Sequence, residues 1–185
     1  MRRRHPLPRL WLMTDERQGD RLWSALTALP RGSGVIVRHY SFPSAERRAL
    51  IARVRRIAKA RRLIMIVAGP AKLARAFGAD GFHRRSAHRT PRDLLRTVAV
   101  HNEPELRLAK RLDADLVFLS PVFATDSHPD GTTLGRVRFG RLAAQSRIPV
   151  IALGGMNRRR ARSLSGLGTY GWAAIGALTP KSGRS

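Results

Sequence analysis

The segment IPVIALGGMNRRR, from Ile148 to Arg160, contains a short apolar run, a glycine turn and the start of a helix. Val150–Leu153 is apolar at every position, which is typical of a strand buried on both faces of a parallel sheet. Two glycines follow it, and Asn157 is a residue that caps helix starts well. The segment therefore predicts one unit of strand, turn and helix.

The same unit recurs along the whole chain. The predicted strands are Leu10–Met13, Val35–Val37, Leu63–Val67, Gly81–His83, Val98–His101, Leu116–Leu119, Val150–Leu153 and Trp172–Ile175. The helical segments between them include Asp20–Leu29, Ser44–Arg61, Ala71–Phe77, Glu103–Leu112, Phe139–Gln145 and Arg158–Leu167. Eight strands alternating with seven helical segments predict an α/β fold, a (β/α)8 TIM barrel.

The end of the chain is short for such a barrel. The sequence predicts a single domain over residues 1–185, with flexible tails at 1–9 and 179–185, and Gly176–Ser185 is too short and too broken for a normal last helix. A missing helix would expose an apolar flank, which a second copy of the chain could cover. We therefore expect a homodimer through the apolar face Leu22, Trp23, Leu26 and Leu29, with Trp23 as its anchor.

The composition excludes several classes of site. The chain has no cysteine, which rules out disulfides, thiolate zinc sites, iron–sulfur clusters and cysteine nucleophiles. No apolar run approaches the roughly 20 residues that cross a bilayer, and the basic start is not followed by the apolar stretch of a signal peptide. We therefore expect a cytoplasmic protein without a membrane partner.

The charge of the chain is strongly positive. Lys and Arg number 36 against 12 Asp and Glu, a formal net charge of +24. Such a protein attracts polyanions, including nucleic acid and phosphorylated metabolites. The basic residues are scattered from Arg2 to Arg184, however, and aromatic residues make up only 6%. We therefore expect non-specific attraction of nucleic acid rather than a dedicated binding face.

The barrel geometry predicts where a functional site lies. In TIM barrels the site is formed by the loops after the strands, and the loops after strands seven and eight commonly hold a phosphate. Gly154-Gly155 and Ile175-Gly176 stand at these two points, where glycine lets backbone N–H groups approach an anion. The same glycines could serve only to make tight turns. Arg38, after strand two, would face a second phosphate group.

Histidines gather at the same predicted end of the barrel. Those placed there by the strand assignments are His39, His83, His101 and His128. Histidine can act as a general acid or base, as a metal ligand or as a hydrogen-bond donor to a phosphate, although each of these residues could also simply fill a polar rim. Their spacing matches no metal-binding motif, so the sequence predicts no metal ligands.

Four segments, in this order, carry a resemblance to a known family. They are LWLMTDER (Leu10–Arg17), GADGFH (Gly78–His83), DADLVFLSPVFATDSH (Asp113–His128) and IPVIALGGM (Ile148–Met156). Together they resemble the thiamine phosphate synthases, a group of (β/α)8 barrels that includes the related thiazole tautomerases. The resemblance implies a transferase of thiamine biosynthesis, which couples a pyrimidine methyl diphosphate with a thiazole phosphate in the presence of Mg2+.

The resemblance also implies roles for particular residues. The catalytic candidates are Arg38, His101 and His128, and the substrate- and phosphate-binding candidates are Arg38, Thr125, Ser127, Gly154, Gly155, Ile175 and Gly176. All of them would act on phosphorylated small molecules.

The carboxylates that hold magnesium in the family are missing. The third-strand Asn-Asp pair falls on Ala68-Gly69, and the aspartate after strand four falls within Arg85–Arg89. Mg2+ is thus implied by resemblance alone, and only Asp15 and Asp126 remain as carboxylates near the mouth. Arginines after strand four could neutralise a phosphate directly instead.

Three functions follow from these observations. The first is a thiamine phosphate synthase-like protein, whose turnover the missing ligands leave in question. The second is a catalytically impaired barrel that binds a thiazole phosphate or another phosphorylated metabolite. The third is a basic scaffold for nucleic acid.

Overall fold

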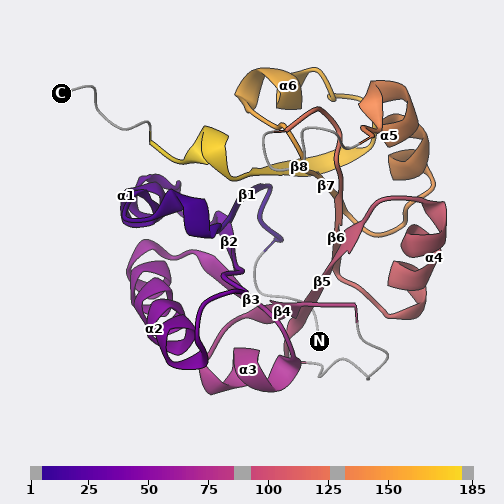
Figure 1. The fold of residues 1–185 in the computed structure, drawn as a ribbon. Helices are drawn as coiled ribbons and strands as arrows, with labels where there is room; N and C mark the ends of the chain where they lie inside the picture. The colour runs from indigo at the N-terminus through magenta and orange to yellow at the C-terminus, as the bar shows by residue number, and fades with distance from the viewer. Residues whose placement is uncertain (1–5, 86–92, 126–131, 181–185) are drawn as a thin grey trace.

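The computed structural model describes residues 6–85, 93–125 and 132–180. Eight parallel strands pair in sequence order and close into a barrel, with the helices on its outside (Figure 1). The strands are β1 (Leu10–Met13), β2 (Gly34–Val37), β3 (Ile64–Ala68), β4 (Gly81–His83), β5 (Leu95–Val100), β6 (Leu116–Leu119), β7 (Val150–Ala152) and β8 (Thr169–Ala174). The predicted (β/α)8 barrel is confirmed, and every predicted strand overlaps an observed one.

The described residues contain six α-helices rather than the seven expected. They are α1 (Arg21–Ala28), α2 (Ser44–Arg61), α3 (Ala71–Ala76), α4 (Glu103–Arg111), α5 (Gly135–Ala144) and α6 (Arg158–Arg162), with two 3-10 turns, η1 (Glu16–Gln18) and η2 (Gly176–Leu178). None is described between β4 and β5. Asn157 caps α6 as predicted, since its side chain accepts the N–H of Arg160, but α6 ends well before the predicted Leu167.

Alternation along the strands separates two kinds of core. Leu12 points outward and packs with buried residues of α1 and α2, whereas its neighbours Trp11 and Met13 point into the barrel. On α2, Leu50, Val54 and Ala58 recur at helical spacing and are buried against the strands. Each strand is therefore covered on both faces, which explains its uninterrupted apolar sequence.

A tryptophan fills the barrel near the N-terminal ends of the strands. Trp11 is fully buried and meets Phe118 edge to face at 5.5 Å. Its indole N–H donates to the carbonyl of Pro8 at 2.8 Å. A Cβ at Gly34 would lie 2.1 Å from the indole ring, so only glycine fits beside it. This packing closes the barrel below Met13 and leaves the opposite end for a site.

The flank beside β8 differs from the prediction. Only η2 follows β8 in the described chain, yet Tyr40 and Val137 are the only exposed large apolar residues there, and neither lies on this flank. Leu22, Leu26 and Leu29 are buried in the chain's own core. The expected apolar flank is therefore wrong for the described residues, because α1 turns these side chains inward.

Trp23, the predicted anchor of a dimer, has a neighbour of its own. The guanidinium of Arg53 lies 3.7 Å from the centre of its ring, and the side chain is half-buried. The homodimer stays a prediction, which light scattering at micromolar concentration would test.

The ends of the described chain are tied to the barrel. The carbonyl of Leu7 accepts the Tyr170 hydroxyl at 2.7 Å. The Thr179 hydroxyl accepts the side-chain amide of Gln18 at 2.7 Å and donates to the carbonyl of Ile175. These contacts fall within the segments expected to be flexible tails.

Among the helices of the described residues, none has the length and apolar character that a membrane span requires.

Candidate functional site

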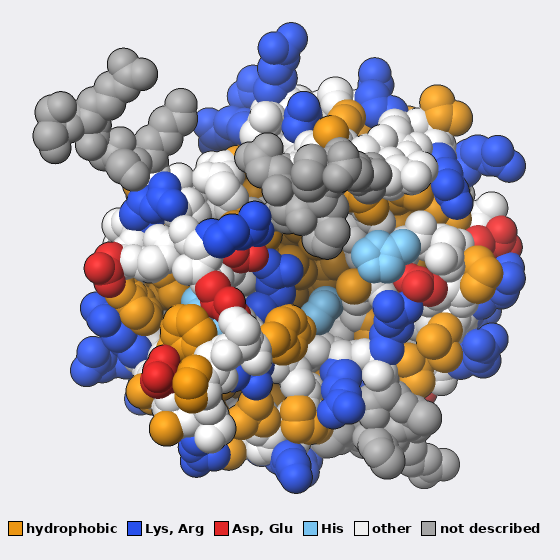
Figure 2. All heavy atoms as spheres, in the orientation of Figure 1, with side chains coloured by type: hydrophobic (Ala, Val, Ile, Leu, Met, Phe, Trp, Pro, Cys, Tyr) orange, Lys and Arg blue, Asp and Glu red, His pale blue; other side chains and the backbone are white. Residues whose placement is uncertain are grey.

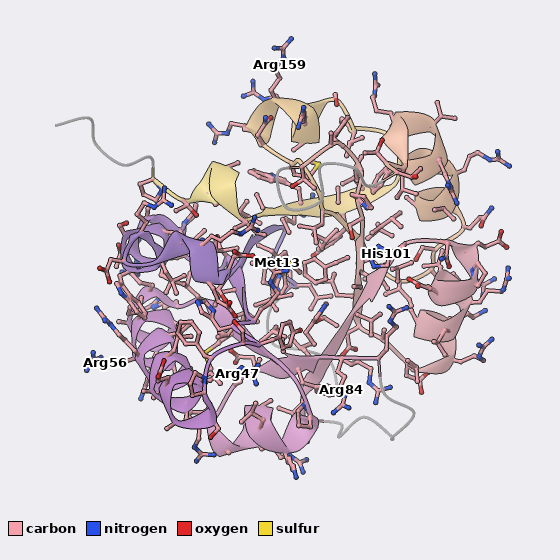
Figure 3. All side chains as sticks on the ribbon, viewed as in Figure 1. Met13, Arg47, Arg56, Arg84, His101 and Arg159 are labelled. Atoms are coloured by element: carbon pink, nitrogen blue, oxygen red, sulfur yellow. The ribbon has the colours of Figure 1, made fainter. Side chains whose placement is uncertain are left out.

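A cavity of about 960 Å3 opens where the strands end. Met13 lies at its centre in Figure 3, and Figure 2 shows the same face hollowed in the middle, with basic and histidine side chains around the hollow. The predicted residues that line it are Arg38, His101, Thr125, Gly154, Gly155, Ile175 and Gly176. Two further predicted residues, Ser127 and His128, lie outside the described residues.

The β7–β8 side of this cavity is formed by backbone. Gly154 and Gly155 have φ of +90° and +59°, values that favour glycine. A Cβ on Gly155 would also lie 2.2 Å from the carbonyl oxygen of Ala124, in the loop after β6. Within the described chain, no acceptor receives the N–H of Gly154, Gly155 or Gly176. These N–H groups are therefore available to a ligand, and their binding of a phosphate stays a prediction.

An arginine borders the same loop. Arg160, in the first turns of α6, donates to the carbonyl of Gly155, and its guanidinium lies 5.0 Å from the centre of the Phe123 ring. It lines the cavity, whereas Arg159 on the same short helix points away from the barrel in Figure 3. Arg160 therefore adds positive charge to the group of free amides.

Arg38 is fixed at the opposite side of the cavity. Its Nε donates to the carbonyl of Thr14 at 2.9 Å, and its Nη2 lies 2.8 Å from the carboxylate of Asp15. Asp15 also accepts Nε of Arg17 at 2.6 Å. The hydrogen bond from Arg17, reinforced by the charge of Arg38, keeps the pKa of Asp15 low despite partial burial. Both arginines thus share one carboxylate.

The histidines have three different environments. The Nδ1 of His101 lies 2.7 Å from the carbonyl of Ser120, which can only accept, so Nδ1 carries a proton and Nε2 faces solvent or a ligand. His83 bonds Thr97 through Nδ1 at 2.8 Å, and burial, with the charges of Arg38 and Arg85, lowers its pKa to about 4. It is therefore neutral at pH 7.

His39 does not reach the cavity. It is buried behind the loop, where its Nδ1 lies 3.0 Å from the Thr14 hydroxyl and its ring packs against Phe42. Burial lowers its pKa, so it is also neutral. Of the histidines that the sequence places at this end of the barrel, His39 lines neither this cavity nor a smaller one that Arg84 and Arg85 line, which agrees with the alternative that it fills a polar position in the rim.

Comparisons with known proteins agree with this geometry. The family described as Thiamine monophosphate synthase matches residues 10–178. The chain belongs to the thiamine monophosphate synthase family.

Several relatives within this family illustrate the likeness. The thiamine-phosphate synthase of Pyrococcus furiosus is 25% identical, over 92% of this chain and 86% of that protein. The enzyme of the same name from Lysinibacillus sphaericus is 33% identical, over 61% of this chain and 57% of its own length. A solved structure, thiamine phosphate pyrophosphorylase from Pyrococcus furiosus, superposes with a TM-score of 0.74 at 23% identity, covering 92% of this chain and 86% of that one.

The described residues do not fit the magnesium ion that the family implies. They contain no cluster of His, Asp or Glu that could hold a metal. Asp15 is already bound by two arginines, and Asp126 lies outside the described residues. At the end of β3, the guanidinium of Arg47 donates to the carbonyl of Ala68, beside Gly69, on which the family's aspartate falls. The position next to Gly69 therefore holds a hydrogen-bonded guanidinium group and not a carboxylate that could bind Mg2+.

Sequence reasoning missed several residues that line the cavity. They include Arg17, Arg21, Tyr40 and Arg160. Arg160 had a usable signal, because the run Arg158–Arg160 places positive charge at a helix start, where the dipole favours anions. Tyr40 offered a weaker one, as a large aromatic residue two positions after Arg38.

Proposed function

We propose that this chain is a phosphate-binding member of the thiamine monophosphate synthase family, whose ligand is thiazole phosphate or a closely similar phosphomonoester. The observation that carries this proposal is a group of backbone N–H donors at Gly154, Gly155 and Gly176, which line one cavity and have no acceptor among the described residues. Donors of this kind suit a phosphate, and the guanidinium of Arg160 beside them adds charge.

Each residue of the site has a role in this proposal. The three glycine amides donate to the phosphate oxygens, and Arg160 neutralises their charge. Met13 and Leu153, which line the same cavity, give the ring of the ligand an apolar surface. His101 presents Nε2 to the ligand, as an acceptor when neutral and as a donor when protonated.

Coupling to a pyrimidine diphosphate is the second candidate function, favoured by family membership and by Arg38 at the far side of the cavity. In the family that reaction needs a metal to stabilise the departing diphosphate. Since the described residues do not fit a magnesium ion, we expect turnover to be absent or far below about 1 per second.

Calorimetry with thiazole phosphate and, separately, with its unphosphorylated alcohol tests the binding proposal. Thiazole phosphate should bind, and its unphosphorylated alcohol should bind at least ~10-fold more weakly, because the alcohol lacks the charged acceptors. Arg160→Gln should weaken thiazole phosphate binding by ~5- to 10-fold, whereas Arg159→Gln, the matched control on the same helix, should not. Equal binding of phosphate and alcohol would overturn the proposal.

A coupled assay with Mg2+ and both family substrates tests the second candidate. Turnover at about 1 per second or faster would show that the chain is an ordinary synthase. Asp15→Asn and Asp126→Asn would then identify which carboxylate replaces the missing ligands.

Nucleic acid is proposed only as a non-specific partner. The net charge of +24 supports weak binding that disappears as salt rises. Binding to one sequence over others at physiological salt would contradict this.

A further inference from the structure

Positive charge is scattered along the sequence, but negative charge is not. All 12 acidic residues lie between Asp15 and Asp130, so the part of the barrel from α5 to η2 has no carboxylate side chain. The same part contains eight arginines. Their charge is therefore not offset locally, in contrast to α4, where Arg107 pairs with Glu103.

The helices α5 and α6 present most of these arginines on the outside of the barrel. Phe139 and Leu142 of α5 belong to the same buried cluster as Leu164, which follows α6. The two segments also approach closely, since a Cβ on Gly140 would lie 3.5 Å from the side chain of Leu167. Because the apolar side chains face inward, six exposed arginines form the outer surface, which we call the α5–α6 surface: Arg136, Arg138, Arg141, Arg158, Arg159 and Arg162.

The guanidinium groups of the α5–α6 surface are unpaired. Within the described chain, none of the six takes part in an ion pair or a side-chain hydrogen bond. Arg160 on the same helix differs, because it donates to the carbonyl of Gly155 and lines the main cavity. Figure 2 shows blue side chains over α6 and α5, and Figure 3 shows Arg159 pointing away from the barrel. The α5–α6 surface is therefore separate from the phosphate site.

The make-up of this surface favours a polymer of phosphates over other anionic partners. Val137, at 80%, is its only exposed large apolar side chain among the described residues, since Phe139 and Leu142 face the core. A helix that lies on a membrane would expose an apolar face instead. Single strands bind by stacking on aromatic rings, and none is exposed among the residues described here. Arginines without such anchors suit the backbone of a duplex.

The surface is long enough to meet several phosphates at once. Helix α5 has ten residues and is therefore about 15 Å long. A duplex carries one charge per about 1.7 Å of its axis, and each phosphate that an arginine neutralises releases counterions. Several of the six arginines can therefore contribute together, with an affinity that falls steeply as salt rises.

We propose that the α5–α6 surface binds the backbone of double-stranded nucleic acid without reading its sequence. This rests on the proposed non-specific attraction of nucleic acid and assigns that attraction to one face of the barrel. The arginines donate to phosphate oxygens and make no contact with base edges. Arg160 keeps its place in the cavity, so a duplex and a phosphorylated small molecule bind independently.

Fluorescence anisotropy with a labelled DNA duplex of about 20 base pairs tests this assignment. The surface variant combines Arg138→Gln, Arg141→Gln and Arg159→Gln. It should bind at least ~10-fold more weakly at about 0.1 M NaCl, because three phosphate contacts are lost. Its plot of log affinity against log salt should also be shallower by about 2–3, since each lost contact lowers the slope by about 1. Replacing the same three arginines by lysine should keep most of the affinity, because only charge is required.

A control variant has the same net charge as the surface variant. It combines Arg56→Gln, Lys59→Gln and Lys72→Gln, three exposed positions on α2 and α3, which lie across the barrel from α6 in Figure 1. Its affinity for the duplex should change by less than ~2-fold, because salt screens charges that are far from the bound duplex. Thiazole phosphate should bind both variants as it binds the wild type, and thermal unfolding shows that both are folded.

The possible failures separate this assignment from the proposals on which it rests. Equal weakening in the surface and control variants would overturn the assignment alone, since binding would then follow net charge. No binding of the duplex at about 0.05 M NaCl would overturn the non-specific attraction as well. Failure of thiazole phosphate to bind would contradict only the proposed phosphate site.

Two further results would point to a different partner and also overturn the assignment. One is tighter binding of a single strand of the same length. The other is loss of binding to vesicles of phosphatidylcholine and phosphatidylserine in the surface variant, with no loss of duplex binding.

Discussion

The two sides of the barrel mouth present different kinds of hydrogen-bond donor. On the β7–β8 side the donors are backbone amides of Gly154, Gly155 and Gly176, whereas on the β2–β4 side they are the guanidinium groups of Arg84 and Arg85. An amide donor is fixed by the path of the chain, and a guanidinium depends on a side chain that one substitution removes. The amide side is therefore tied to the fold, and the arginine side is free to change.

The largest effect is expected at Gly155. Gly155→Ala forces a Cβ to within 2.2 Å of the Ala124 carbonyl at a φ of +59°. We expect it to lower the free energy of unfolding by about 2–4 kcal/mol and to abolish thiazole phosphate binding. Gly176→Ala, where a Cβ meets open space, should change stability by less than about 0.5 kcal/mol. Urea denaturation and calorimetry measure both, and equal stability of the two variants would contradict the tight loop contact.

The second effect is a pH dependence that arises on the arginine side. The folded pKa of His83, about 4, lies below its ordinary value of 6.5, so the unfolded chain binds the proton more readily. Stability should therefore fall as the pH drops from 6.5 to 4, by about 3 kcal/mol. His83→Gln should remove most of this dependence. An NMR titration that finds His83 protonated at pH 6 would refute the prediction.

A smaller effect is expected at the carboxylate that lies between the two sides. Asp15→Asn leaves Arg17 and Arg38 without their shared counter-charge. Because the folded pKa of Asp15 is lowered, its contribution is present above its ordinary pKa and is lost as the pH falls through the folded value. We expect a loss of about 1 kcal/mol at pH 7, with the wild type and the variant converging as the pH falls through the lowered pKa of Asp15. Parallel stability curves over this range would show that the ion pairs contribute nothing.

The smallest expected effect is a difference between the two sides in how strongly salt weakens ligand binding. From about 0.05 to about 0.5 M NaCl, the affinity of the arginine side for a pyrimidine diphosphate, the ligand of the second candidate function, should weaken by ~3- to 5-fold. Thiazole phosphate at the amide side should weaken less, because partly enclosed backbone donors are screened less than exposed guanidinium groups. Identical salt slopes in calorimetry would remove the distinction between the sides.

The same contrast explains what the sequence could predict. The strands were predictable because burial on both faces leaves uninterrupted apolar runs such as Leu116–Leu119. The glycines of the amide side also had a local signal, because they follow the last two strands, although the sequence alone does not distinguish an anion site from a tight turn. Both features depend on the local sequence and on the closure of the barrel.

The arginine side could not be predicted in the same way. Whether Arg85 reaches Glu105, or Arg38 and Arg17 converge on Asp15, depends on side-chain paths across separate loops. The position of Arg47, which reaches from α2 to the end of β3, has no local signal at all. The prediction of an exposed apolar flank was wrong for the same reason, because the rotation of α1 about its own axis decides which side its leucines face.

The tryptophan that closes the lower barrel has a kinetic consequence. With Trp11 packed against Gly34 and Phe118, small molecules have no path through the axis, so entry and exit share the wide end. Two ligands bound in that cavity at the same time would have to use the same opening. Their exchange should follow a fixed sequence, in which the occupant nearer Met13 arrives first and departs last.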